Sequence, residues 1–250
     1  MRNRVNILGI RFDNLDARDA LSWCERSLNE KKKGYIVTPN AEFVYACRQN
    51  ETSRTLINNA ALVTPDGIGV VYAGKILGTP VKGRVPGCDL AESLAASMAK
   101  SGHTLYLLGA KPGVAEKAAE NMKVKHPGLK IVGTHDGYFK DAEPVLEDIR
   151  RTAPDVVFVC LGFPKQEQFM ADHLQTLPCT LMLGLGGSLD VFAGVVNRAP
   201  EIYQQLGMEW FYRLCQEPKR IKRMAKLPLF LLIAVKERLL HGKSRQEDPQ

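Results

Sequence analysis

Asp66 is the residue of this sequence whose surroundings most suggest acid–base chemistry. It stands between Pro65 and Gly67 in the stretch ALVTPDGIGVVYAG, with apolar residues on both sides. An Asp-Gly pair is an ordinary turn signal, so the carboxylate could simply shape a tight connection. On a rigid Pro-Asp-Gly corner beside apolar neighbours it could instead be partly desolvated, which would strengthen it as a general base. Both interpretations stay open at this point.

Three glycine-rich turns could contact a phosphate-bearing ligand. They read GAKPG (109–113), GFPKQE (162–167) and GLGGSLD (184–190), and each follows an apolar run. Ligands of open α/β sheets bind at the carboxyl ends of strands, where small residues admit phosphate. None of the turns matches the dinucleotide fingerprint G-x-G-x-x-G or the P-loop. Taken alone, such glycines could equally be packing and turn devices.

Alternating apolar runs and helical patterns indicate the elements that position these residues. Continuous apolar runs favour buried strands, whereas apolar residues spaced i, i+3, i+4 favour amphipathic helices. The sequence predicts a Rossmann-like α/β fold, in which helices cover a mostly parallel sheet. The predicted strands are 4–12, 34–40, 103–110, 130–139, 155–162 and 180–187, and the predicted helices are 16–32, 114–126 and 142–152, with another after 162–167.

The composition fits a globular intracellular protein. Of the 250 residues, 45% are hydrophobic and 24% are charged, which is enough to form a full core. The six cysteines are scattered, with no C-x-x-C pair and no zinc-finger spacing, so free thiols are expected. The first residues lack the sustained apolar region of a signal peptide.

The positive charge is concentrated at the C-terminal end. From Arg213 onward there are ten Lys and Arg against four acids, whereas the net charge of the whole chain is +7. The apolar run 227–235 is nine residues long and contains Pro228, against about twenty residues for a spanning helix. A basic, amphipathic, proline-kinked segment suits a membrane interface. A C-terminal helix packed on the core and a nucleic-acid contact remain alternatives.

Several longer stretches, taken together, resemble a known family. In order along the chain they are TPNAEF, TPDGIGVVYAGKILG, RVPGCDL, LLGAKPGVAEKAA, GFPKQEQF, GLGGSLDVFAGVVNRAP and GMEWFYRLCQEPKRIKR, spanning about 38–223. These blocks resemble the WecG/TagA/CpsF family of bacterial glycosyltransferases. The resemblance implies an inverting transferase that moves N-acetylmannosamine, or a related hexose or uronic acid, from a UDP-sugar to an N-acetylglucosaminyl-diphospho-undecaprenol acceptor.

The resemblance also assigns roles within the blocks. Asp66 falls on the position of the family's proposed catalytic aspartate. Thr38 and Asn40 match residues near the same pocket, where they could bind the sugar or orient the aspartate, or else serve as turn and cap residues. The candidate substrate-binding residues are Arg84, Gln166, Glu167, Gly109, Gly186, Gly187, Ser188 and Asp190.

No metal or other cofactor is expected. Asp-x-Asp, which holds a divalent metal in many nucleotide-sugar transferases, is missing, and its nearest match, DAE at 141–143, suits the first turn of a helix. Arginines would then neutralise the leaving diphosphate. The candidates for that clamp are Arg213, Arg220 and Arg223.

These expectations divide the chain into a catalytic core, 1–207, and a basic membrane-associating appendage, 208–250. The expected partners are the UDP-sugar, the polyprenyl-linked acceptor and the inner face of the cytoplasmic membrane, where the protein would be peripheral; no nucleic acid is expected, and a homo-oligomer is left open. The pathway would be teichoic acid or surface polysaccharide synthesis. The alternatives are a hexosyltransferase of exopolysaccharide synthesis in the same family and, from other classes, a nucleic-acid-binding or a dinucleotide-dependent protein.

Overall fold

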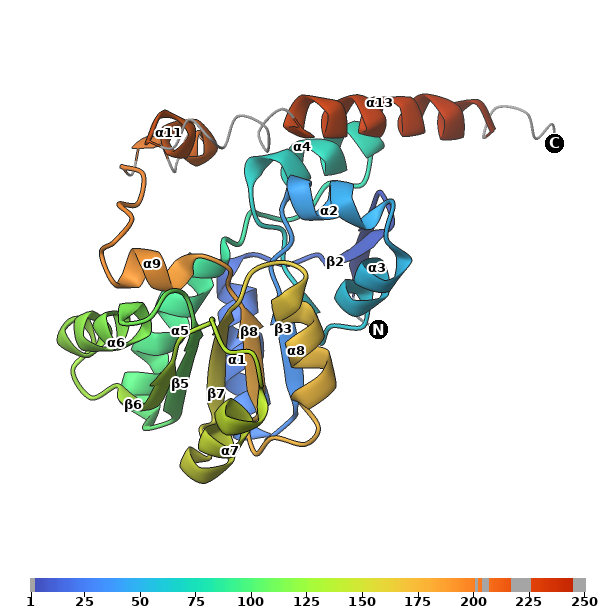
Figure 1. The fold of residues 1–250 in the computed structure, drawn as a ribbon. Helices are drawn as coiled ribbons and strands as arrows, with labels where there is room; N and C mark the ends of the chain where they lie inside the picture. Colours follow the sequence, from blue (N-terminus) through green and yellow to red (C-terminus); the bar gives the residue numbers. More distant parts are fainter. Residues whose placement is uncertain (1–2, 201, 204–206, 217–225, 245–250) are drawn as a thin grey trace.

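A parallel sheet lies at the centre of the molecule. The computed structural model describes residues 3–200, 202–203, 207–216 and 226–244. In the described part, six strands pair in parallel in the order β4-β3-β8-β7-β5-β6 (Figure 1). They are β3 (Gly34–Val37), β4 (Leu62–Val63), β5 (Thr104–Gly109), β6 (Lys130–His135), β7 (Val156–Cys160) and β8 (Leu181–Gly184). The predicted α/β class with a mostly parallel sheet is confirmed.

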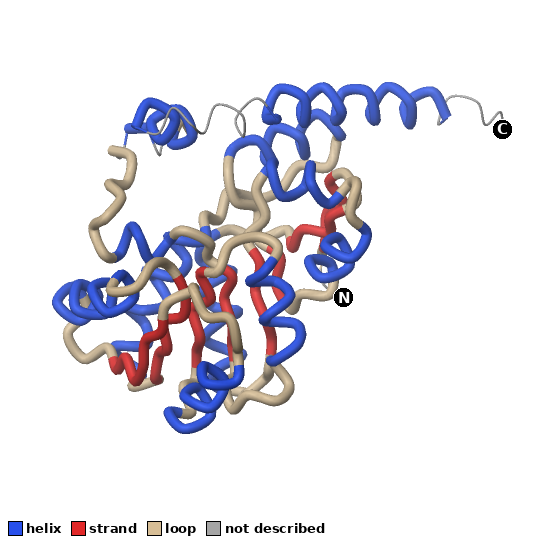
Figure 2. The backbone as a smooth tube through the Cα atoms, viewed as in Figure 1, coloured by secondary structure: helices blue, strands red, loops and turns tan. Residues whose placement is uncertain are grey.

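Helices cover both faces of this sheet (Figure 2). One face packs on α1 (Ala17–Asn29), α5 (Gly87–Ser101), α6 (Val114–Lys125) and α9 (Ser188–Phe192). The other packs on α7 (Glu143–Thr152) and α8 (Lys165–His173). The helices α2 (Ala41–Cys47), α3 (Glu51–Asn58) and α4 (Ile68–Leu77) continue the same core cluster beyond the sheet, where α2 and α4 lie next to the C-terminal helix of the described part (Figure 1). Side chains alternate between the faces of a strand, so Val157 enters one core and Phe158 the other. This two-sided burial explains why the strands read as continuous apolar runs.

The N-terminal stretch 4–12 forms a hairpin outside the main sheet, which corrects the prediction of one strand there. β1 (Arg4–Ile7) pairs antiparallel with β2 (Ile10–Asp13). Leu8 and Gly9 between them have φ of 51° and 93°, as the favoured two-residue hairpin turns require. The pair Leu-Gly carries no clear turn signal in the sequence, because leucine seldom adopts positive φ.

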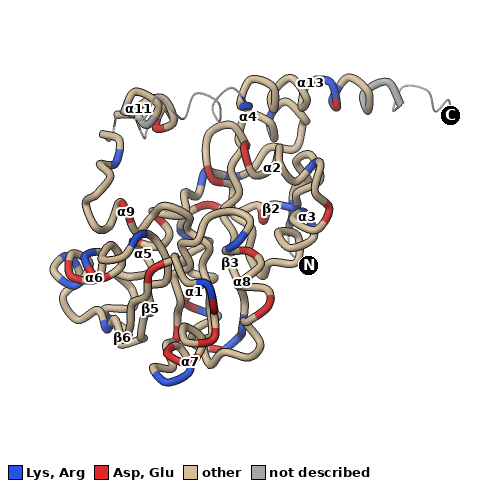
Figure 3. The backbone as a smooth tube through the Cα atoms, viewed as in Figure 1, with Lys and Arg blue, Asp and Glu red and all other residues tan. Residues whose placement is uncertain are grey.

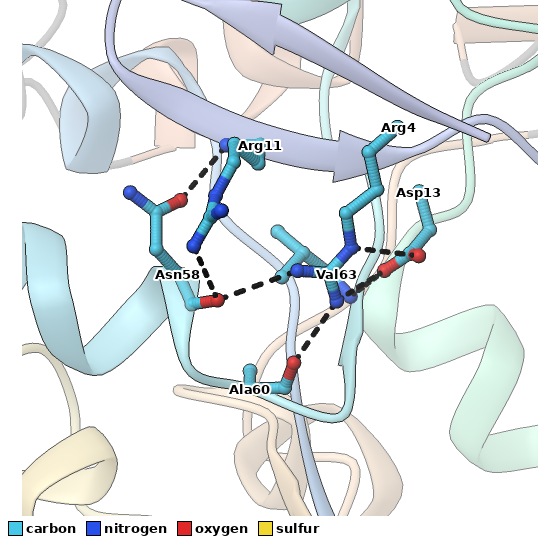
Figure 4. A network of polar contacts seen from close by, with 6 residues as sticks. All are labelled: Arg4, Arg11, Asp13, Asn58, Ala60 and Val63. Atoms are coloured by element: carbon cyan, nitrogen blue, oxygen red, sulfur yellow. Dashed lines mark hydrogen bonds and ion pairs between the residues drawn. The ribbon is translucent and has the colours of Figure 1, made fainter. Parts of the chain in front are cut away.

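A polar network fastens this hairpin to the body of the protein (Figure 4). The buried Asp13 carboxylate accepts hydrogen bonds from Arg4 Nε at 3.0 Å and Nη2 at 3.2 Å, and from the Val63 backbone N–H at 2.9 Å. Arg4 also donates to the Ala60 carbonyl at 3.1 Å. Because the buried charge is paired and its remaining acceptors are used, it can be kept in the interior.

In the described part, two longer helices follow the α/β core. They are α11 (Glu209–Gln216) and α13 (Lys226–Ser244), and α13 lies along α4 and α2 (Figure 1). Phe230 and Ala234 of α13 are fully buried in the core cluster beside α4. Pro228 falls in the first turn of α13, where its missing N–H is not needed, so the helix continues past it without a break.

The predicted division of the chain into a core, 1–207, and an appendage, 208–250, stays a prediction. The packing of α13 on the core does not test it, because residues 217–225 lie outside the described part. In the ranges that are described, no helix combines the length and the apolar character needed to span a membrane.

Candidate active site

The loops of four neighbouring strands meet at one edge of the sheet. Val63 pairs with Val37, Val37 with Gly184, and Gly184 with Val159, so β4, β3, β8 and β7 end at the same level. Parallel strands bring their carboxyl ends to one edge, which is where open α/β sheets bind ligands. The sequence stretches TPN, TPDG, GLGGS and GFPK are therefore neighbours in space.

A cleft of about 460 Å³ opens among these loops. Its volume is in the range of small-molecule sites, roughly 300–1,000 Å³. The structure brings eight of the predicted residues together in its lining: Thr38, Asn40, Asp66, Arg84, Gly186, Gly187, Ser188 and Asp190. The roles of these residues toward a substrate stay predictions. The structure shows that they come from four separate stretches of the chain and line one cleft.

Hydrogen bonds to both its backbone and its carboxylate hold Asp66 in place. Its backbone N–H donates to the Pro39 carbonyl at 3.2 Å, which ties the loop after β4 to the loop after β3. Its Oδ2 accepts from the Gly87 N–H at 3.3 Å, at the start of α5. Gly67 begins α4 with φ of +86°, a conformation that favours glycine. The Pro-Asp-Gly corner thus aims a fixed, half-buried carboxylate into the cleft.

Thr38 lies on the other side of Gly87. Its hydroxyl donates to the Gly184 carbonyl at 3.3 Å and so links the ends of β3 and β8. A Cβ on Gly87 would lie 2.8 Å from Thr38 Oγ1, so only glycine allows α5 to approach both Thr38 and Asp66. The hydroxyl and the carboxylate therefore share one wall of the cleft.

Asn40 caps a helix, which is one of the two roles that the sequence allowed for it. Its Oδ1 accepts from the Glu42 N–H at 2.9 Å and the Phe43 N–H at 3.1 Å, capping α2. The residue also lines the cleft. The Asn40 side chain thus caps a helix at the edge of the cleft, and its role toward a substrate stays a prediction.

Three predicted substrate contacts lie outside the cleft lining. Gln166 and Glu167 are buried at the start of α8. Gly109 ends β5, where a Cβ would be 2.3 Å from the Cys160 carbonyl oxygen, so its glycine is required for packing against β7. Direct contact of these three with substrate stays a prediction, and the structure gives each a role inside the fold.

The cleft contains cationic side chains, one of which the sequence analysis missed. Arg84 Nη1 lies 3.9 Å from Glu209 Oε2 of α11, with both side chains largely buried. Arg198 was not singled out; it forms an ion pair with Asp89, and its buried Nε has no hydrogen-bond acceptor among the described residues. A lone Arg in a loop carries no spacing signal, although it lay within the recognised block GLGGSLDVFAGVVNRAP.

The predicted arginine clamp cannot be placed. Arg220 and Arg223 lie outside the described residues, and Arg213 belongs to α11 without a described side chain. Arg84 and Arg198 are the guanidinium groups that the described part brings into the cleft. In that part no group of three or more His, Cys, Asp and Glu side chains is arranged to hold a metal ion.

Aromatic and aliphatic side chains form another part of the wall. The rings of Phe43 and Phe163 lie with centroids 4.5 Å apart, and Trp210 of α11 and Leu227 of α13 also line the cleft. These residues were not among the predicted site residues, because no local pattern in the sequence connects positions so far apart in the chain. The cleft thus has polar groups for a charged ligand and an apolar side toward α11 and α13.

The fold and the cleft define an α/β enzyme that accommodates a small polar ligand at the carboxyl ends of its strands. A fixed carboxylate, guanidinium groups and the backbone of a glycine turn can remove a proton and stabilise a leaving anion. The chain belongs to the glycosyl transferase WecG/TagA/CpsF family, whose sequence profile matches residues 5–244. It is a glycosyltransferase, as the resemblance implied.

Curated relatives are similar over most of the chain. A protein of Bacillus spizizenii is 37% identical over 216 residues, covering 86% of this chain and 84% of its own. One of Bacillus subtilis is 34% identical over 232 residues (92% and 91%), and one of Staphylococcus aureus is 34% identical over 233 residues (91% of each). Each is named N-acetylglucosaminyldiphosphoundecaprenol N-acetyl-beta-D-mannosaminyltransferase. Of the function classes that the sequence left open, family membership selects glycosyl transfer.

Proposed function

We propose that this chain transfers N-acetylmannosamine from UDP-N-acetylmannosamine to undecaprenyl-diphosphate-linked N-acetylglucosamine, in the synthesis of a cell-wall or surface polymer. The names of the relatives support this donor sugar and acceptor. The observation that carries the proposal is the position of Asp66, held by Pro39 and Gly87 in a cleft that also contains Arg84 and Arg198.

The chemistry follows from these groups. The Asp66 carboxylate takes the proton of the acceptor hydroxyl as its oxygen attacks C1 of the donor sugar. The bond from C1 to the diphosphate oxygen breaks, its electron pair leaves with UDP, and C1 is inverted. Arg84 and Arg198, with the backbone N–H of Gly187 in the turn after β8, neutralise the charge on the diphosphate.

We propose further that this neutralisation needs no metal. Guanidinium groups match the geometry of phosphate oxygens and carry a permanent charge, which makes them substitutes for a divalent cation. Arg213, Arg220 and Arg223 are assigned to the same task from the sequence alone. The partners of Arg84 and Arg198 in the structure are carboxylates, Glu209 and Asp89, which an incoming diphosphate would replace or join.

The C-terminal helices favour a peripheral position at the membrane that holds the acceptor. On α13 the side chains of Leu229, Leu232, Val235, Leu239 and Leu240 are exposed, and on α11 those of Trp210 and Phe211. On α13 the charged residues Lys236, Glu237 and Arg238 follow the apolar run 227–235 and precede Leu239 and Leu240. Figure 3 shows charged positions in the middle of this helix. An exposed apolar face beside cationic groups is typical of interfacial helices.

A transfer assay with a panel of donors tests the proposal. The protein is incubated with a lipid-linked N-acetylglucosaminyl diphosphate and several UDP-sugars, with and without a chelator, and the product is identified by mass spectrometry. We expect N-acetylmannosamine to be transferred at the same rate in both conditions. A requirement for added magnesium or manganese would overturn the metal-free mechanism, and preferential transfer of another hexose would favour the exopolysaccharide alternative.

Asp66→Asn tests the base. Replacing the carboxylate by an amide removes the proton acceptor, and general base catalysis contributes about 10²–10⁴-fold. We expect transfer to fall at least about 100-fold while UDP binding and thermal unfolding stay near the wild-type values. Asp172→Asn, at an exposed position of α8 whose carboxylate accepts from Gln168, is the matched control. Wild-type transfer by Asp66→Asn would exclude this residue as the base.

A further inference from the structure

Glu167 is a buried carboxylic acid near the cleft. It takes part in none of the ion pairs formed by the described residues. Its side chain is 1% exposed, like that of Gln166 beside it. Glu167 Oε1 accepts from Gln166 Nε2 at 2.8 Å, whereas its buried Oε2 has no hydrogen-bond partner among the described residues. Each buried polar atom left unsatisfied costs about 1–3 kcal/mol, so an acid at this place calls for an explanation.

The hydrogen bonds of Gln166 lead from Glu167 to the cleft. Gln166 Oε1 accepts from the Gly186 backbone N–H at 2.9 Å. Gly186 has φ of +54° and belongs to the glycine turn that lines the cleft after β8. A single chain of two hydrogen bonds therefore joins the buried acid to the backbone that faces the ligand.

The space around Gln166 is shaped for its carboxamide. A Cβ on Gly184, at the end of β8, would lie 2.9 Å from Gln166 Nε2 and 3.3 Å from its Cδ. The same Gly184 accepts the hydrogen bond of Thr38 through its carbonyl. The carboxamide thus fills the position beneath the strand end, where it supports both the glycine turn and the residue bonded to Thr38.

We propose that Glu167 is a positioning residue for sugar transfer, which orients the Gln166 carboxamide so that Gln166 fixes the Gly186–Ser188 turn against the nucleotide diphosphate. This inference rests on the proposed function for the identity of the ligand. In this role both residues act through the backbone of the turn, because Gln166 bonds the Gly186 N–H and Glu167 bonds Gln166. A carboxamide suits this relay because it donates with one end and accepts with the other.

The orienting role needs the acceptor oxygen of Glu167 and not its charge. Burial raises the pKa of Glu167, so its environment favours the neutral acid. The ionisable groups packed nearby are Tyr35 of β3 and Cys47 of α2, each with a pKa raised to about 12 by burial and secondarily by Glu167. Arg54 of α3 acts on Cys47 in the opposite direction.

A pair of variants separates positioning from charge. Glu167→Gln keeps a carbonyl oxygen that can accept from Gln166, whereas Glu167→Leu removes the acceptor and leaves Gln166 Nε2 unpaired. We expect Glu167→Gln to bind UDP and transfer sugar within about twofold of wild type. We expect Glu167→Leu to weaken UDP binding and raise the donor KM about tenfold, equivalent to about 1.4 kcal/mol, with the acceptor KM unchanged.

A surface substitution on the same helix serves as the control. Gln168→Leu changes an exposed residue of the same helix and should leave both constants unchanged. UDP is titrated into each variant by calorimetry, so binding is measured without transfer. Wild-type UDP affinity in Glu167→Leu, or a loss in Glu167→Gln equal to that in Glu167→Leu, overturns the inference. Failure of the wild-type protein to bind UDP would instead overturn the proposed function.

The pH dependence of stability gives a second measurement. A buried acid whose folded pKa lies above its ordinary 4.5 stabilises the fold fully below that value, and this contribution is lost as pH rises through the folded pKa. Glu167→Gln has no such dependence. We therefore expect the free energy of unfolding of Glu167→Gln relative to wild type to increase between pH 4 and pH 8. A difference that stays constant would contradict a buried neutral acid.

Discussion

Asn40 shows at the scale of one residue how a single side chain can serve both the fold and the cleft. Its Oδ1 caps α2, which follows directly from the strand end that carries Thr38. It also lines the cleft that contains Asp66. Substituting it changes two properties at once, and the two can be separated because aspartate caps a helix as well as asparagine does.

We predict that Asn40→Ala loses about 1 kcal/mol of unfolding free energy together with most transfer activity. Asn40→Asp should recover the stability but not the activity, because it adds a second carboxylate to the wall that holds Asp66 and removes an amide donor. Chemical denaturation and the transfer assay measure the two effects.

Asn50 is the matched control, because it caps α3 through Oδ1 and the Ser53 N–H and does not line the cleft. Asn50→Ala should lose similar stability while keeping its activity. Full activity in Asn40→Asp would mean that Asn40 serves only as a cap.

At the scale of elements, one close contact connects α13 to the helix that begins beside Asp66. Gly69 lies in the first turn of α4, and a Cβ there would be 2.5 Å from Leu227 Cδ1 of α13. Both residues line the cleft. The position of α13 is therefore set next to the loop of the proposed base.

A double-mutant cycle tests this contact. Ala is favoured over Gly in a helix by about 1 kcal/mol, so Gly69→Ala would stabilise α4 if nothing opposed it. We expect Gly69→Ala to destabilise wild type and to be clearly less destabilising in the Leu227→Ala background, because the shortened side chain leaves room. Denaturant unfolding of the four proteins measures the coupling.

Ala41 Cβ would lie 3.0 Å from the new methyl group in both backgrounds, so the cycle isolates Leu227. Equal effects of Gly69→Ala in the two backgrounds would show that α13 does not pack on Gly69 in solution.

At the scale of the whole molecule, α11 and α13 lie on the same side, away from the sheet, with α13 next to α4 (Figure 1). The exposed fractions of Leu232 and Leu239 on α13 reach 65% and 64%. Contiguous apolar surface of this kind marks an interaction site. The apolar part of the cleft wall, at Trp210 and Leu227, belongs to the same two helices.

We predict that a Leu232→Glu, Leu239→Glu double variant loses most of its binding to vesicles of anionic phospholipid. The charges would have to enter the acyl boundary, while the exposed positions keep the fold intact. Vesicle co-sedimentation measures binding, and a water-soluble acceptor analogue should still be glycosylated.

Val124→Glu supplies the control, since Val124 is 81% exposed on α6, far from α13 in the fold. Equal vesicle binding by the wild type and the double variant would assign the apolar face of α13 to another partner.

The sequence determined the class of fold and the identity of most of the polar residues in the cleft. Apolar runs such as 155–162 report burial on both faces of a strand, and this property is local. The corner at Asp66 and the turn at 184–190 were also visible, because turns need particular residues in particular order. The resemblance to the family extended this to function.

Only the tertiary structure decided which of those residues face the cleft. Arg198 and Trp210 line it, whereas Gln166 and Glu167 are buried at the start of α8 and do not line it. The direction of a side chain near a helix start depends on the close approach of Gly184 and Gly186 from another strand, and that approach leaves no mark in the local sequence. Sequence periodicity encodes burial within one element, whereas the site is made of contacts between elements far apart in the chain.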